Sequence, residues 1–231
     1  MHIPDGFIDG STSAGAAVVA ASGIGVSLRR AAEVLDERRV PLAGLVAAFV
    51  FAVQMLNFPV ASGTSGHLLG GLLAAVLVGP SVGAVCVAVV LAVQALLFAD
   101  GGLSALGLNI VNIALITAFG GYAVFALLRR VLPRTTSSVV AASGIAAGVS
   151  VVLSSIAFTA EYAIGGAGTA SVASVAGAMV GVHVLIGIGE GVITGLVVSA
   201  VLASRPDLVW GARSLVRATV RFPASAGRAA S

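Results

Sequence analysis

Long runs of apolar residues with almost no charge make up most of this 231-residue sequence. Hydrophobic residues account for 58% of the chain and charged residues for only 9%, against about 25% charged in an ordinary soluble domain. Thirty glycines and few aromatic residues suit helices that pack closely through small side chains in lipid. The sequence therefore predicts an all-α, polytopic membrane protein.

Seven segments are long and apolar enough, or nearly so, to cross a membrane. A complete crossing needs about 20 apolar residues, and the segments are 8–28, 41–57, 66–79, 82–99, 104–128, 137–160 and 174–203. The third is short for a crossing. It is bounded by the stretch FPVASGTSG and by Pro80, both typical of breaks between helices. We predict seven transmembrane helices.

The arginines fall in alternate loops of this seven-span arrangement. With the N-terminus outside, all twelve basic residues are cytoplasmic, and the outer loops hold only acidic charges: Asp5, Asp9, Asp100 and Glu161. Because basic residues concentrate in cytoplasmic loops, we expect the N-terminus outside and the C-terminus in the cytoplasm. The opposite orientation, or six or eight spans, would place arginine clusters on the wrong side.

The composition excludes several kinds of active site. The chain has no lysine, which rules out a GxxxxGK[ST] nucleotide-binding loop and a Schiff-base lysine. An HExxH motif and a zinc-type Cys/His cluster are also absent, and the single cysteine, Cys86, is interpreted as a small buried hydrophobe. We therefore expect no enzyme, and any ATP hydrolysis would occur on a separate subunit.

The first two residues, Met1 and His2, have the chemistry of a metal chelate. The α-amine of Met1, the deprotonated backbone nitrogen of His2 and Nδ1 of its imidazole can close two fused rings around an ion. The opening ten residues lack the positively charged region of a signal peptide, so we expect Met1 to remain the mature terminus. A disordered terminus is the alternative, but Ile3 and Phe7 can anchor the segment against the bundle.

A second histidine, His67, lies on the same outer side in the predicted topology. Its nitrogen would complete a square-planar set of four, the geometry favoured by Ni(II) or Cu(II) and open to low-spin Co(II). Because the ligands must lose protons, binding should weaken as pH falls. The alternative is a helix-start histidine bonded to backbone.

Other polar residues lie near the predicted outer ends of the apolar spans or in the loop before His67. We interpret them as pocket-lining groups or as groups that orient the ligands, with simple interhelical hydrogen bonding as the alternative. They are Gln54, Asn57, Ser62, Thr64, Ser65 and Gln94. Deeper in the last span, His183 and Glu190 are seven residues apart on one helical face. They are candidates for a proton relay or a buried structural pair.

Two parts of the chain are expected to differ in role. Residues 1–205 form one predicted transmembrane metal-binding domain, with residues 1–7 inserted into the helix bundle. Residues 206–231 form a basic cytoplasmic tail, which we interpret as a solvated or lipid-surface segment rather than a docking helix.

At these residues the sequence closely resembles the CbiM/NikM family, the substrate-specific membrane (S) components of energy-coupling-factor (ECF) transporters for cobalt and nickel. The resemblance rests on MHIPDGF, VPLAGLVAAFVFAVQMLNFPVASGTSGHLLGGLLAAVLVGPSVG, QALLFADGGLSALGLNIVNIA and HVLIGIGEGVIT. It covers about residues 1–130 and 178–200, and SGTSGHLLGG is more similar to the nickel branch. It implies a seventh helix added to the six of other substrate-binding components, and Met1, His2 and His67 as metal ligands.

The resemblance also implies partners and a role. These are a transmembrane coupling (T) protein, ABC ATPase subunits and a small accessory membrane subunit, in a bacterial or archaeal cytoplasmic membrane. The chain would capture Ni(II), or Co(II), from outside as transported ligand rather than cofactor, without nucleic acid. A stand-alone secondary divalent-metal permease is the main alternative. An intramembrane hydrolase is disfavoured, because no nucleophile and base have a suitable spacing.

Overall fold

The computed structural model describes residues 1–37, 39–59 and 65–215. Within them the chain is mostly helical: α1 (Gly10–Val34), α2 (Arg39–Gln54), α3 (Gly71–Val78), α4 (Pro80–Leu97), α5 (Leu106–Asn109), a π-helix (Ile110–Gly120), α6 (Gly121–Val131), α7 (Thr136–Gly165) and α8 (Val172–Ser204). Two strands of two residues each, β1 (Phe58–Pro59) and β2 (Ser65–Gly66), pair antiparallel. Short 3₁₀ turns at Pro206–Leu208 and Trp210–Ala212 follow α8.

The helices agree with the prediction of a helical membrane protein. Five stretches of the described chain are long and apolar enough to cross a bilayer: Gly10–Val34, Pro80–Leu97, Leu106–Val131, Thr136–Gly165 and Val172–Ser204. Helix α2 is apolar but has 16 residues, and α3 has only eight. A helix lies in each of the seven predicted segments, but the number of complete crossings stays a prediction.

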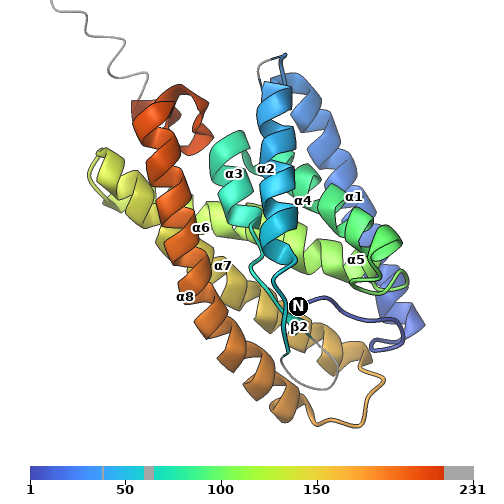
Figure 1. Cartoon of the computed structure of the whole chain (residues 1–231). Coiled ribbons are helices and arrows are strands. Elements are labelled where there is room, and N and C mark those ends of the chain that lie inside the picture. Colours follow the sequence, from blue (N-terminus) through green and yellow to red (C-terminus); the bar gives the residue numbers. More distant parts are fainter. Residues whose placement is uncertain (38, 60–64, 216–231) are drawn as a thin grey trace, which may run out of the picture.

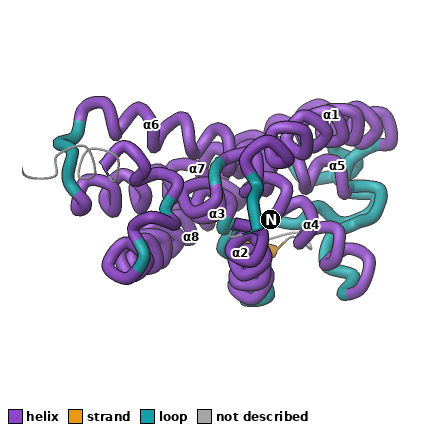
Figure 2. Tube along the Cα trace, turned by 90° about the horizontal axis from the view of Figure 1, so that it is seen from above, coloured by secondary structure: helices purple, strands orange, loops and turns teal. Residues whose placement is uncertain are grey.

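Helix α3 lies inside the bundle, and all eight of its residues are buried. It contacts α2, α4, α6, α7 and α8. Seen from above, α6 and α8 lie toward one side of the molecule and α1 and α5 toward the other, with α2, α3 and the N-terminus between them (Figure 2).

The start of the predicted span 66–79 was wrong, because α3 begins at Gly71. Gly70 precedes it with φ +72°, a left-handed conformation that glycine adopts without strain.

The bounds of two other helical segments also differ from the predicted spans. Helix α1 continues to Val34, so Arg29 and Arg30 lie within the helix and not in the following loop as the predicted span 8–28 implied. The predicted span 104–128 becomes a composite of α5, the π-helix and α6. Long π-helices are rare, and π-type turns recur near functional sites.

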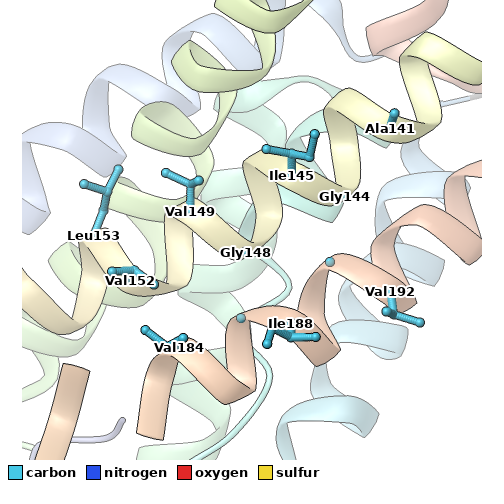
Figure 3. A pocket seen from close by; sticks show the side chains of 12 residues that line it. Ala141, Gly144, Ile145, Gly148, Val149, Val152, Leu153, Val184, Ile188 and Val192 are labelled. Atoms are coloured by element: carbon cyan, nitrogen blue, oxygen red, sulfur yellow. The ribbon is translucent and has the colours of Figure 1, made fainter. Parts of the chain in front are cut away.

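Helices α7 and α8 pack through glycines. An added Cβ at Gly144 would lie 2.9 Å from the carbonyl oxygen of Gly191, and one at Gly148 would lie 2.9 Å from that of Gly187. Small residues at such crossings let the two backbones approach closely. Beside the crossing, Gly144, Gly148 and apolar side chains including Ile145, Val184 and Ile188 line a surface groove (Figure 3). Since the groove has an apolar lining, it offers no ligand set for a metal ion.

The first ten residues of the predicted tail fold back onto the bundle. Val209 and Ala212 are buried. Two guanidinium groups lie near the Trp210 ring, with Cζ of Arg213 3.0 Å and Cζ of Arg39 5.6 Å from the ring centroid. The domain boundary at 205 stays a prediction, and most of the tail, including Arg217 and Arg221, lies outside the described residues.

Candidate metal-binding site

The N-terminal segment enters the helix bundle. Met1 and Ile3 are fully buried, and His2 is 4% exposed. In Figure 1 the N-terminus lies beside β2, below the end of α2. A disordered terminus, the alternative considered from the sequence, does not describe this arrangement.

Asn109 fixes the backbone of Ile3. The Ile3 N–H donates to Asn109 Oδ1 at 2.7 Å, and Asn109 Nδ2 donates to the Ile3 carbonyl at 3.2 Å. The Gly102 N–H donates to the same carbonyl at 2.9 Å. Both backbone polar groups of Ile3 are therefore satisfied inside the protein, which sets the register of the segment.

The loop that follows α4 approaches His2 closely. Gly101 has φ +90°, and a Cβ added there would lie 3.0 Å from His2 Nδ1 and 3.0 Å from Asn109 Nδ2. A side chain at this position would therefore be strained and crowded. Residues farther along the segment are fixed to α7 and its C-terminal end: the Phe7 ring contacts the rings of Phe158 and Tyr162.

Asp5 anchors the segment to the start of the next helical stretch. Its Oδ1 accepts hydrogen bonds from the backbone N–H of Ser104 at 2.8 Å and from the Ser104 hydroxyl at 2.5 Å. These bonds favour the ionised form, so the pKa of Asp5 lies below its ordinary value of 3.8. The anchor is therefore fully present above that pH and is lost as pH falls through the lower pKa of the folded protein.

Replacing Asp5 by alanine is expected to make the terminal amine more accessible. The chain has no lysine, so an amine-acylating reagent can modify only the α-amine of Met1. Without the bonds to Ser104 the segment should open more often, and acylation at neutral pH should be several-fold faster, as measured by mass spectrometry. Asp9→Ala is the matched control, because Asp9 caps α1 through Thr12. Equal rates in Asp5→Ala and wild type would contradict the anchoring role.

Burial changes the protonation of the first two residues. Desolvation lowers the pKa of the Met1 amine to about 4, partly opposed by Asp100. Desolvation and the nearby amine lower the pKa of His2 to about 4, again opposed by Asp100. Both groups are therefore neutral at pH 7, the state in which a nitrogen has a lone pair to donate to a metal ion.

His67 lies directly against His2. The two rings stack with centroids 4.6 Å apart and an interplanar angle of 27°. His67 Nδ1 is 2.8 Å from the carbonyl oxygen of Leu68. A carbonyl can only accept, so Nδ1 carries the hydrogen and the lone pair lies on Nε2. That Nε2, like Nε2 of His2, is buried without a hydrogen-bond partner in the described part of the chain.

The stacked rings are close but not oriented for a shared ion. A nitrogen lone pair lies in the plane of its ring, and the two ring planes are stacked at 27° with their centroids 4.6 Å apart, so a lone pair of one ring does not point toward the other ring. A metal ion bound by both histidines would require at least one ring to rotate. No group of three or more His, Cys, Asp or Glu side chains among the described residues is arranged to hold a metal ion. A metal site here would therefore need donors of other kinds, such as the terminal amine or backbone nitrogen.

Three of the predicted supporting residues have clear positions. Gln54 Nε2 donates to the Leu69 carbonyl at 2.7 Å, beside His67. Asn57 Nδ2 donates to Asp100 Oδ2 at 3.2 Å, and that carboxylate oxygen lies 3.6 Å from His2 Nε2. Gln94 is fully buried, and its side-chain amide has no hydrogen-bond partner among the described residues. Ser62, Thr64 and the side chain of Ser65 lie outside what the structure describes.

His183 and Glu190 are both buried but bond to different groups. His183 Nδ1 lies 2.7 Å from the Met179 carbonyl in its own helix. Glu190 accepts from the backbone N–H groups of Leu69 at 2.7 Å and Gly70 at 2.6 Å. Glu190 thus reaches the segment that carries His67, and His183 Nε2 has no hydrogen-bond partner among the described residues. A role of the two residues as a relay or a buried pair stays a prediction.

Sequence reasoning did not select several residues that contact the first residues of the chain. Asn109 and Ser104 bond to Ile3 and Asp5, and Asp100 Oδ2 lies 3.6 Å from His2 Nε2. The Ser154 hydroxyl lies 2.9 Å from Met1 Sδ and 2.7 Å from the Asn112 carbonyl. Asn109 and Asn112 stand out as amides in an apolar span, which is a usable signal. Ser104 and Ser154 are ordinary in the sequence, and only the fold brings them to the site.

The comparisons with known proteins agree on one family. The family model described as "Cobalt uptake substrate-specific transmembrane region" (CbiM) matches residues 2–208. A putative metal transport protein of Haloquadratum walsbyi is 37% identical, covering 91% of this chain and 94% of its own. A putative fused nickel transport protein NikMN of Archaeoglobus fulgidus is 41% identical, covering 90% of this chain and 68% of its own.

Cobalt-named relatives and solved structures give the same result. The cobalt transport protein CbiM of Sorangium cellulosum is 38% identical, covering 79% of this chain and 81% of its own. A crystal structure of a transition metal transporter superposes with a TM-score of 0.84 at 28% identity, covering 97% of this chain and all of that one. The fold and the site thus define a multi-pass helical membrane protein with a buried N-terminal segment. This chain belongs to the CbiM family.

Proposed function

We propose that this chain is the substrate-specific membrane subunit of an ECF-type transporter and captures Ni(II) from outside the cell for ATP-driven uptake. The observation that carries the proposal is the burial of Met1 and His2 against His67. A buried terminal amine beside two imidazoles supplies nitrogen donors and excludes water. The names of the related nickel and cobalt transport proteins support a divalent metal as the transported ligand.

The proposed ligands are the α-amine of Met1, the backbone nitrogen and Nδ1 of His2, and Nε2 of His67. The first three are already adjacent through covalent geometry, and the hydrogen bond from His67 Nδ1 to Leu68 leaves Nε2 available. The ion would make the His2 amide acidic enough to lose its proton. Four nitrogens in one plane suit Ni(II) and also allow Co(II).

The proposed topology has seven crossings, with the N-terminus outside. Basic residues at the opposite end support it: Arg29 and Arg30 are near the end of α1, and Arg129 and Arg130 are in the last turn of α6. In this orientation the N-terminal segment lies at the outer side of a bacterial or archaeal cytoplasmic membrane.

The proposed partners are a transmembrane coupling protein, separate ABC ATPase subunits and a small accessory membrane subunit. The absence of lysine excludes a nucleotide-binding loop of the P-loop type in this chain. The fused form named NikMN supports an association with a further component. A secondary permease would rely on His183 and Glu190 as metal or proton ligands, but in the structure each of them bonds to backbone groups.

The test is metal loading of the purified full chain, followed by uptake in vesicles. We expect one Ni(II) per chain, Co(II) as a weaker competitor, and uptake only when the coupling protein and ATPases are present with ATP. A chain that binds neither ion would contradict the proposal. Uptake without an ATPase would favour the permease instead.

A further inference from the structure

The segment 67–70 carries His67 and is bonded to two helices that are distant in sequence. Gln54, the last residue of α2, donates to the Leu69 carbonyl at 2.7 Å. Glu190, in α8, accepts from the N–H groups of Leu69 and Gly70 at 2.7 and 2.6 Å. Helix α2 therefore binds a carbonyl of the backbone that follows His67, and α8 binds its N–H groups.

The Glu190 carboxylate is well matched to this segment. It is 3% exposed, and each of its two oxygens accepts one backbone N–H. A buried carboxylate costs free energy unless its oxygens are hydrogen-bonded, and bonds from N–H groups to an ionised oxygen are stronger than neutral ones. Gly70, which precedes α3, has no side chain of its own to cap that helix. Glu190 thus fixes the backbone of the two residues that lead into α3.

The bonds made by Glu190 act on the orientation of the His67 ring. His67 Nδ1 is bonded to the Leu68 carbonyl, and Leu68 is followed directly by the two residues that Glu190 holds. A shift of these peptide units moves the carbonyl and therefore turns the imidazole. His183 cannot have this effect through hydrogen bonding, because its Nδ1 is bonded within α8.

We propose that Glu190 positions His67 for the metal ion and links release of the ion to the position of α8. The inference rests on the proposed function, since it requires His67 to be a ligand. Glu190 is a positioning residue: it acts through the backbone of residues 69–70 and not on the ion. When α8 moves away from this segment, both hydrogen bonds lengthen together and His67 loses its orientation.

The experiment compares Glu190→Gln with the wild-type full chain in detergent. The glutamine keeps the shape but offers one acceptor where two N–H groups need one each. We expect Ni(II) affinity to fall by about 10- to 100-fold, the usual effect of losing a group that orients a ligand. Dissociation into excess chelator should be faster, and the visible absorption band of bound Ni(II) should shift. A loss of stability alone would not shift that band.

Two further variants make the test specific. Thr194→Val is the matched control, because Thr194 is 1% exposed and lies one helical turn beyond Glu190 in α8; it should retain wild-type affinity, rate and spectrum. Glu190→Asp keeps both acceptors on a stem one methylene shorter. It should fold and release Ni(II) at a rate between those of wild type and Glu190→Gln. The comparison with wild type therefore still tests the role of Glu190 if the glutamine variant does not fold.

The outcomes separate this inference from the proposed function. Wild-type affinity, release and spectrum in both Glu190 variants, with binding lost in His67→Ala, would overturn the role of Glu190 and leave the function intact. Failure of the wild-type chain to bind Ni(II), or normal binding by His67→Ala, would instead overturn the proposed site.

Discussion

A chain with one glycine added before Met1 is expected to lose Ni(II) binding. The extension converts the proposed amine ligand into an amide and places the new amine one residue away. The segment cannot slip by one residue to compensate, because Asn109 holds both backbone groups of Ile3. We expect affinity to fall by more than about 100-fold, beyond the usual cost of losing a group outside the ligand set. Isothermal titration calorimetry on the purified protein measures it.

The control for the extension is a glycine added after Ser231, which should leave affinity unchanged. A second readout uses the single amine of this lysine-free chain. Bound Ni(II) should protect the Met1 amine of the wild-type chain from acylation. Unchanged affinity in the extended protein, or acylation at the same rate with and without Ni(II), would show that the amine is not a ligand.

The second large effect is expected for His67→Ala. Alanine removes the nitrogen proposed to close the metal site, so affinity should again fall by more than about 100-fold. Since the imidazole is fully buried, the variant also leaves a cavity beside His2. Added imidazole should occupy that cavity and restore part of the Ni(II) binding, which a general loss of folding would not allow.

His183→Ala is the matched control for that substitution. His183 is also a fully buried histidine whose Nδ1 bonds a backbone carbonyl, but this carbonyl belongs to its own helix. Its loss should lower thermal stability and leave Ni(II) affinity near the wild-type value. Equal losses of affinity in the two variants would mean that any buried cavity disturbs the site, and His67 would no longer stand out as a ligand.

The helices were predictable because long apolar runs and their breaks are local signals. The break before Pro80 lies where the sequence places it, and α7 and α8 fall within a few residues of their predicted ranges. The start of α3 was not predictable. Residues 67–70 read as part of an apolar helix, but the N–H groups of Leu69 and Gly70 donate to Glu190, about 120 residues away, instead of joining the helix.

The part of the candidate site that consists of neighbouring residues in the sequence was predictable. Met1 and His2 are adjacent in sequence, so their chelating geometry can be read directly, and the fold places His67 against them. The anchoring groups were harder to find. Asp100 and Ser104 read as an ordinary polar loop, and nothing local indicates that this loop passes beside the N-terminus. Glu190 was noticed as a buried charge, but its partner could not be named from the sequence.

The close glycine packing of α7 and α8 has a mechanical consequence. Helix α7 and its C-terminal end touch the N-terminal half of the site: Ser154 contacts Met1, and the Gly165 carbonyl accepts from the Asp9 N–H. Helix α8 holds the other half through Glu190. Because the two backbones meet at Gly144, Gly148, Gly187 and Gly191, the helices have little freedom to separate and should move as one rigid body. A movement of this helix pair would displace both halves of the site at the same time.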